Sequence, residues 1–150
     1  MPPTTAALAR GLAPGVLISL TSLATRHACG RISSVGAAQD VPLRPPAWVF
    51  GVVWPILYVT TGLAWYRAPR SLDPHFALII GLCCAWLVVY VCARAKRAAA
   101  TILVAAMALA AHTAWRAPAR TQAPLVPLAL WLAFAAYLNV AEAVMVSATD

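Results

Sequence analysis

Long apolar stretches alternate with short polar segments along most of the chain. Five of these stretches are close to the roughly 20 residues that an α-helix needs to cross a bilayer. They run over about 5–25, 47–66, 76–93, 98–115 and 123–146. The first begins near residue 5 because Arg10 can extend its charged end to the membrane surface. The pattern predicts an all-α fold in which residues 1–150 form a single domain, an integral membrane bundle of five transmembrane helices.

Basic residues lie mostly between the apolar stretches, as is typical of proteins with several transmembrane helices. Five spans place the two termini on opposite sides of the membrane. The basic residues then divide into Arg10, Arg67, Arg70, Arg116 and Arg120 on one side, and Arg26, Arg31, Arg44, Arg94, Lys96 and Arg97 on the other. This near-equal division does not set the orientation through an excess of positive charge on the cytoplasmic side.

The connections between the stretches differ in length. Residues 94–97 form a connection of four residues, which predicts a tight antiparallel pair of helices. Residues 26–46 form a connection of 21 residues that is rich in Gly and Pro. A connection of this length is either a lid over a binding site or a solvated linker, and the sequence favours neither.

The composition agrees with a membrane protein. Hydrophobic residues make up 63% of the chain and charged residues 10%, whereas soluble domains average roughly half apolar and a quarter charged. These proportions exclude most soluble domains and a disordered chain, and 4 cysteines are too few for a disulfide scaffold. The net charge of +7 lies at the two membrane surfaces, where it suits lipid head groups rather than nucleic acid.

The 6 tryptophans are more than membrane hydrophobicity requires. Trp48, Trp65 and Trp115 lie near the ends of stretches, where an indole ring suits the head-group region, and we interpret them as an aromatic belt. The other three lie well inside their stretches: Trp54, Trp86 and Trp131. A buried indole N–H requires an acceptor, so these rings either face the bundle interior or a polar ligand, or are only core packing.

Two helical faces combine aromatic and small or polar side chains at a spacing of four residues. They are Phe50, Trp54 and Tyr58 in the second stretch, and Trp131, Ala135 and Asn139 in the fifth. An Asn at membrane depth is costly unless it forms a hydrogen bond, and a small Ala beside it leaves room. Pro55 and Pro127 remove backbone hydrogen bonds and permit kinks that open space between helices. We interpret the two faces as walls of a cavity.

The same residues belong to longer motifs. The string PPAWVFGVVWPILY, residues 45–58, resembles the second-helix signature of the tryptophan-rich sensory protein and translocator protein family, also called the peripheral benzodiazepine receptor family. The string WLAFAAYLN, residues 131–139, is similar to the fifth-helix motif of that family. Trp86, Tyr90 and Arg94 follow its third-helix pattern, and the resemblance covers nearly the whole chain.

The resemblance implies a five-helix bundle, often a homodimer, with a pocket between the helices that the long first loop closes. It implies porphyrins such as protoporphyrin IX or haem as ligands, sterols as a further class, and no required cofactor. With the two faces described above, the candidate ligand-binding residues are Phe50, Trp54, Tyr58, Cys83, Trp86, Tyr90, Trp131, Ala135, Leu138 and Asn139.

Two departures from the family pattern bear on the ligand. Cys83 occupies the position of a third-helix Asn, so that a weakly bonding thiol replaces one polar contact. Sterol-binding members carry a basic residue after the fifth-helix tyrosine, which is Tyr137 here, but no Lys or Arg occurs from Asn139 to Asp150. Sterol binding is therefore less well supported than porphyrin binding.

Other chemistry has little support. Cys83, Cys84 and Cys92 fall in the third stretch without a His or an acid at ligand spacing, so we interpret them as buried thiols and expect no metal site. No Ser or Cys nucleophile has a His nearby in the sequence, and we assign no catalytic residue. His112 is either a ligand to haem iron or, as we favour, a packing or interfacial residue. Glu142 is either a protonatable group near the cavity or, as we favour, an interfacial residue.

Three functions are therefore compared. The first, which we favour, is a membrane receptor or transport-type protein for a flat hydrophobic ligand. The second is an enzyme that degrades porphyrin under light through Trp54 and Trp131, and the third is a structural membrane protein without a ligand. The resemblance implies the outer mitochondrial membrane if the source is a eukaryote or its virus, and a cell-envelope membrane if it is a bacterium.

Overall fold

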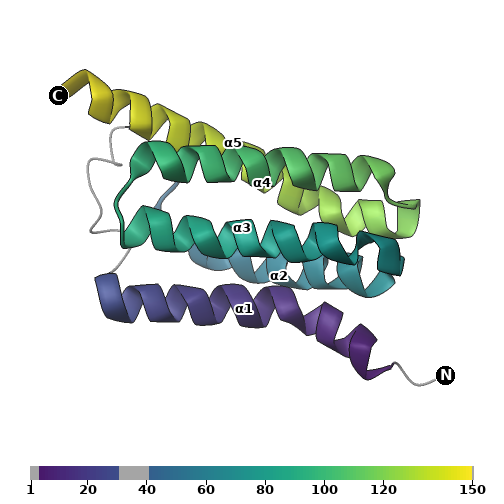
Figure 1. Cartoon of the computed structure of the whole chain (residues 1–150). Coiled ribbons are helices and arrows are strands. Elements are labelled where there is room, and N and C mark those ends of the chain that lie inside the picture. Colours follow the sequence, from purple (N-terminus) through teal and green to yellow (C-terminus); the bar gives the residue numbers. More distant parts are fainter. Residues whose placement is uncertain (1–3, 31–40, 150) are drawn as a thin grey trace.

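The computed structural model describes residues 4–30 and 41–149, and within them the long elements are five α-helices (Figure 1). These are α1 (Thr5–Cys29), α2 (Ala47–Arg67), α3 (Asp73–Val91), α4 (Lys96–Arg116) and α5 (Ala119–Thr149), and the short 3-10 helix η3 (Arg70–Leu72) precedes α3. All five α-helices are long and apolar enough to cross a membrane. The predicted all-α fold with five transmembrane helices is confirmed.

The largest extensions beyond the predicted bounds occur in α1 and α5. α1 continues to Cys29, so the connection predicted to begin at residue 26 begins instead at Gly30. α5 begins at Ala119 although Pro124 and Pro127 lie inside it. Prolines are tolerated in membrane helices because neighbouring side chains and helices satisfy the backbone groups that they leave free.

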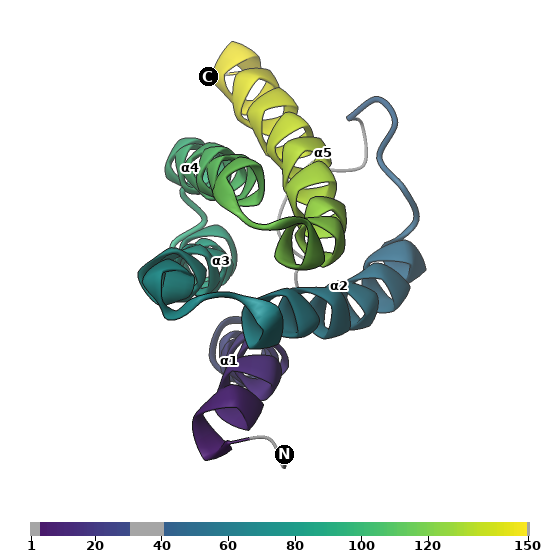
Figure 2. The same cartoon turned by 90° about the vertical axis from the view of Figure 1, so that its right-hand side faces the viewer.

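The five helices form a closed ring in the order α1, α2, α5, α4, α3. Each helix packs against the next one in this order, and α3 returns to α1. Figure 2 shows the ring from one end, with α5 between α2 and α4. The residues of the second and fifth stretches are therefore neighbours in space, as the cavity interpretation requires.

Small residues allow α4 to approach its neighbours closely. The buried positions of α4 follow one face and are mostly alanines: Ala99, Ala100, Leu103, Ala106, Ala110, Thr113 and Ala114. They pack against larger buried side chains of α3 and α5, among them Phe76, Leu128 and Leu132. Interfaces between membrane helices are commonly rich in small residues, because packing rather than hydrophobicity drives their association.

Glycines mark the crossing of α1 and α2. A Cβ atom added at Gly62 of α2 would overlap the carbonyl oxygen of Gly11 in α1, and a Cβ atom at Gly15 would lie 3.6 Å from the Tyr58 Cβ. Gly11 and Gly15 are four residues apart and so occupy one face of α1. This is the small-xxx-small arrangement that brings two membrane helices into backbone contact.

A disulfide joins α1 to α3 at the end of the bundle where the long connection begins. It links Cys29, the last residue of α1, to Cys92, which caps the end of α3, with Cα atoms 5.1 Å apart. The interpretation of Cys92 as a thiol within the third span is therefore wrong, because α3 ends before it and the end of α1 lies beside it. Cys83 and Cys84 are free cysteines, the first buried and the second half-buried.

The described part of the long connection touches α5. Val41 is buried, and the Tyr137 hydroxyl donates a hydrogen bond to the Pro42 carbonyl oxygen at 3.3 Å. Residues 31–40 of the predicted lid, with Arg31 among them, lie outside the described residues.

Candidate functional site

The aromatic face of α2 packs against α5. Phe50 meets Trp131 edge-on, with ring centroids 5.6 Å apart and an angle of 72° between the planes. On α2, the Trp54 and Tyr58 rings lie 5.9 Å apart, and on α5 the Trp131 and Phe134 rings lie 5.6 Å apart. All five rings are half-buried. They form an aromatic wall that keeps part of its ring surface accessible.

Most of the candidate residues lie in or against one hydrophobic cluster. One hydrophobic cluster contains six of the ten: Trp54, Tyr58, Cys83, Trp86, Trp131 and Ala135. Leu138 and Asn139 are buried one turn further along α5. Tyr90 belongs to a second cluster, which Trp86 contacts as well. The structure thus brings most of the predicted site together, from α2, α3 and α5.

Trp86 and Asn139 satisfy each other's hydrogen-bonding needs. The indole N–H of Trp86 in α3 donates to the Asn139 side-chain oxygen in α5 at 3.0 Å. The Asn139 amide nitrogen donates to the Ala135 carbonyl oxygen at 3.0 Å, within its own helix. Both groups were expected to need a partner at membrane depth, and the structure shows that the partner is the other group.

Trp131 is different from Trp86. Its indole nitrogen is buried and finds no hydrogen-bond partner among the described residues. Its ring packs against the aromatic rings of Phe50 and Phe134, which offer no hydrogen-bond acceptor of their own. A buried N–H group without an acceptor costs about 1–3 kcal/mol, so the site holds one polar group that an acceptor on a ligand would satisfy.

A buried ionic group lies at the end of α3. The Tyr90 hydroxyl donates a hydrogen bond to a Glu142 carboxylate oxygen at 2.7 Å, and Lys96 pairs with the other oxygen at 3.0 Å. The Lys96 ammonium also lies 3.7 Å from the centroid of the Tyr90 ring. The Glu142 side chain is only 3% exposed, so it is held by two partners rather than by solvent.

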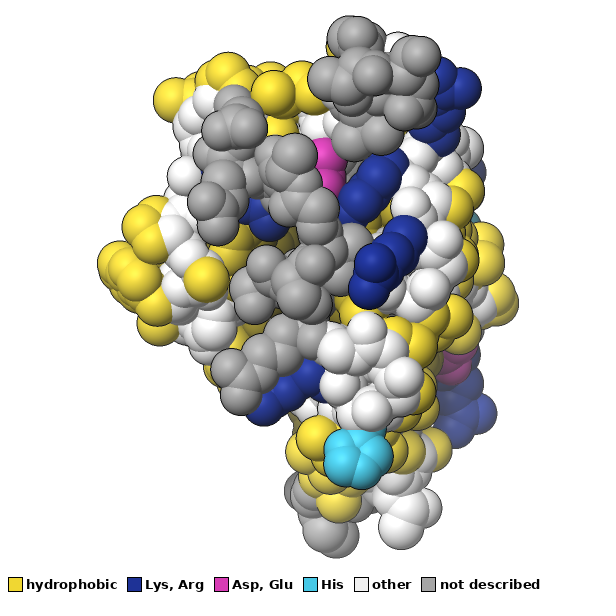
Figure 3. Space-filling view, turned by 90° about the vertical axis from the view of Figure 1, so that its left-hand side faces the viewer, with side chains coloured by type: hydrophobic (Ala, Val, Ile, Leu, Met, Phe, Trp, Pro, Cys, Tyr) yellow, Lys and Arg dark blue, Asp and Glu magenta, His cyan; other side chains and the backbone are white. Residues whose placement is uncertain are grey.

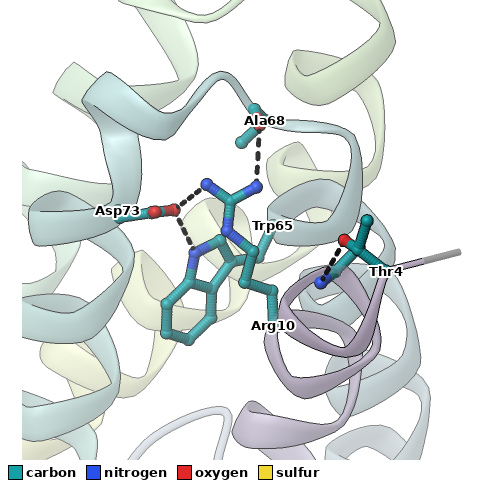
Figure 4. A network of polar contacts seen from close by, with 6 residues as sticks. Thr4, Arg10, Trp65, Ala68 and Asp73 are labelled. Carbon is teal, nitrogen blue, oxygen red and sulfur yellow. Dashed lines mark hydrogen bonds and ion pairs between the residues drawn. The ribbon is translucent and has the colours of Figure 1, made fainter.

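A second polar network ties three helices together at the opposite end of the bundle (Figure 4). Arg10 of α1 forms an ion pair with Asp73 at the start of α3 and donates to the Ala68 carbonyl oxygen at 3.3 Å. The Trp65 indole nitrogen donates to the same carboxylate at 2.8 Å, and its ring stacks on Phe76. Trp65 therefore packs within the bundle, two residues before the end of α2.

The positions of the acidic residues in the sequence could have indicated both networks, although a hydropathy profile does not show them. Only 4 acidic residues occur in the chain, and two of them, Asp73 and Glu142, lie in α3 and α5. Acidic groups at such positions are costly and pair with basic partners. Arg10 and Lys96 are those partners. Arg10 was expected to extend to the membrane surface, and its guanidinium group pairs with Asp73 at one end of the bundle.

The two remaining predicted belt residues are exposed, Trp48 at 69% and Trp115 at 81%. His112 is exposed as well, and its ring lies 6.3 Å from that of His75 on α3. Within residues 4–30 and 41–149, no group of three His, Cys, Asp or Glu side chains could hold a metal ion.

Comparison with known proteins adds one finding. A sequence model described as the TspO/MBR family matches residues 11–144, which is nearly the whole chain. The comparison with curated proteins found no match.

Proposed function

Because the chain belongs to the TspO/MBR family, we propose that it is a membrane receptor or transport-type protein that binds a hydrophobic tetrapyrrole between α2 and α5. Protoporphyrin IX and haem are the ligands of this class. Their flat macrocycles match the accessible aromatic surface of Phe50, Trp54 and Trp131, since aromatic rings pack well in offset-stacked or edge-on arrangements.

The observation that carries the proposal is the indole N–H of Trp131, which has no hydrogen-bond partner in the described part of the chain. The equivalent groups of Trp65 and Trp86 both donate to side-chain oxygens. Porphyrin carboxylates supply acceptor oxygens, and a hydrogen bond to a charged acceptor is worth about 1.5–3 kcal/mol. Ala135, which lies one turn from Trp131, is the small residue that leaves room for the ligand. Pockets for small molecules are mostly apolar with a few polar groups that fix the ligand.

Titration of the purified protein with protoporphyrin IX, followed through tryptophan fluorescence, tests the proposal. We expect saturable quenching for the wild type. Trp131→Phe keeps an aromatic ring but removes the N–H donor, and we expect it to weaken binding about tenfold, which corresponds to about 1.4 kcal/mol. Trp115→Phe is the matched control, because that ring is highly exposed, and it should leave the dissociation constant unchanged.

The same titration separates the competing functions. Non-saturable quenching, or an equal loss in Trp131→Phe and Trp115→Phe, would indicate a structural protein without this site. A product spectrum that appears only when the loaded protein is illuminated, and disappears in Trp54→Phe with Trp131→Phe, would indicate the porphyrin-degrading enzyme instead. Competition by a sterol at similar concentration would extend the ligand class to sterols.

Two further expectations belong to this proposal. The family resemblance implies a homodimer, which size-exclusion chromatography with light scattering in detergent measures. It also implies the outer mitochondrial membrane for a eukaryotic or viral source and a cell-envelope membrane for a bacterial source. Both stay predictions.

A further inference from the structure

A recess opens at the end of the bundle where α3 turns into α4. Its volume is about 430 Å³, and it is lined by Arg94, Ala95, Lys96, Arg97, Ala98, Ala143 and Ser147. The first five residues form the turn and the start of α4, and the last two come from α5. Figure 3 looks onto this end of the molecule and shows Lys and Arg side chains gathered on it. The recess lies apart from the proposed tetrapyrrole site between α2 and α5.

The lining carries positive charge that it does not itself neutralise. Three of the seven lining residues are basic and none is acidic. The charge of Lys96 is matched by Glu142, which pairs with it at 3.0 Å. Arg97 donates from two nitrogens to the Ser147 hydroxyl, at 3.1 and 2.7 Å, but that oxygen is neutral. Arg94 and Arg97 therefore leave a positive recess that an anion would complement.

The backbone at the recess favours the same charge. Ala95, the residue that caps α4, supplies no side-chain acceptor to the first turn of this helix. The N-terminus of a helix carries the positive end of its dipole and backbone N–H groups that bind anions. Arg94 adopts a left-handed backbone with φ of 53°, which makes the turn tight and keeps it short.

The position of the recess identifies the anion. α3 and α4 are both membrane-spanning candidates, so the turn between them lies at the depth of the lipid head groups. Tetrahedral phosphate groups are the abundant anions at that depth, and Arg binds phosphate through several N–H donors at once. We propose that this recess is a binding site for the phosphate of an anionic phospholipid, held by Arg94, Arg97 and the start of α4.

Native mass spectrometry of the detergent-purified protein tests this site. The protein is titrated with phosphatidylglycerol and, separately, with phosphatidylcholine of the same acyl chains. We expect the wild type to retain one phosphatidylglycerol molecule more tightly than phosphatidylcholine. In Arg94→Asn with Arg97→Gln, the dissociation constant for phosphatidylglycerol should rise at least about tenfold. Asn is chosen at position 94 because it tolerates the left-handed backbone.

Matched variants distinguish this site from general surface charge. Arg116→Gln with Arg120→Gln removes two exposed charges from the opposite end of the bundle and should leave phosphatidylglycerol binding unchanged. Arg94→Lys with Arg97→Lys keeps the charges but loses the multiple N–H donors, and should weaken binding less than Arg94→Asn with Arg97→Gln does. Equal losses in the two neutralised variants, or no loss in the first, would overturn the proposal. Displacement of the lipid by glycerol phosphate at the same concentration would overturn the lipid as occupant, because acyl chains would then contribute nothing.

Discussion

Five of the 6 tryptophans fall into three distinct environments. Trp48 and Trp115 are largely exposed and suit the head-group region. Trp65 and Trp86 are half-buried and donate their N–H groups to Asp73 and Asn139. Trp131 combines a buried indole nitrogen with no acceptor among the described residues, which costs stability and is consistent with a role in binding.

The hydrogen bond between Trp86 and Asn139 can be tested by a double-mutant cycle. Asn139→Leu leaves the buried Trp86 N–H without an acceptor, so we expect it to lower the free energy of unfolding by about 1–3 kcal/mol. Trp86→Phe leaves the Asn139 oxygen unpaired and should have a similar effect. The double variant removes both polar groups and should be less destabilised than the sum of the two. Thermal unfolding in detergent measures all three.

Trp131→Phe is the control for that cycle. It removes an N–H group that has no partner among the described residues, so we expect little loss of stability. A loss as large as that of Trp86→Phe would show that Trp131 has a structural partner, and would remove the main support for the proposed binding site.

At the level of single residues, sequence reasoning predicted the need for partners more readily than their identity. The helical period places Trp131, Ala135 and Asn139 on one face, and membrane depth requires Asn139 to form a hydrogen bond. Which group supplies that bond depends on how α3 is rotated against α5. No local sequence pattern specifies that rotation. The pairing of Asn139 with Trp86 could therefore be seen only in the packed structure.

Among the helices, α1 depends most on a few specific contacts. Only 11% of its apolar window is buried, against 39% for α3, α4 and α5. Three features hold it to the ring: the glycine crossing with α2, the ion pair of Arg10 with Asp73 and the disulfide of Cys29 with Cys92. Removing any one of these features should therefore lower the stability of the protein more than a typical surface substitution does.

Gly62→Ala tests the glycine crossing. The added Cβ would overlap the Gly11 carbonyl oxygen, so α1 and α2 must separate and lose backbone contact. We expect a lower unfolding temperature in detergent. Gly51→Ala in the same helix is the matched control, since a Cβ there meets nothing within 4 Å. That change should be neutral or stabilising by up to about 1 kcal/mol, because Ala favours helices. Equal effects at the two positions would contradict the close crossing.

Cys29→Ser with Cys92→Ser tests the disulfide. The two cysteines are 63 residues apart, and closing a loop of that length stabilises a folded chain by about 4 kcal/mol in the chain-entropy model. We expect the variant to unfold at a lower temperature and to be insensitive to dithiothreitol, whereas reduction should lower the unfolding temperature of the wild type. A wild type that does not respond to reductant would rule out the bond.

Helix number was predictable from hydropathy because the thickness of the bilayer sets the length of each span. The residues at which the helices begin and end were less predictable. α1 reaches Cys29 and α5 starts at Ala119, since polar residues can continue a helix beyond the apolar core. The disulfide was missed because its two halves lie at the ends of helices that are not consecutive, and only the order of the ring brings them together.

Across the whole molecule, the two ends of the bundle differ in chemistry. One end carries the Arg10, Trp65 and Asp73 network, in which the acid is shared by two donors. The other carries the disulfide, the buried pair of Lys96 and Glu142, and the basic recess. Between them lies the aromatic region of α2, α3 and α5. In this arrangement the proposed tetrapyrrole site lies in the membrane-spanning part of the bundle and the proposed phosphate site lies at its end.

The most direct test of the central proposal observes the Trp131 indole N–H itself. Protein labelled with ¹⁵N at tryptophan gives one indole resonance for each of the 6 tryptophans, and single Trp→Phe variants assign them. On addition of protoporphyrin IX, we predict that the Trp131 resonance changes most, while those of Trp65 and Trp115 stay in place. Changes confined to the exposed Trp48 and Trp115, with Trp131 unaffected, would contradict ligand binding between α2 and α5.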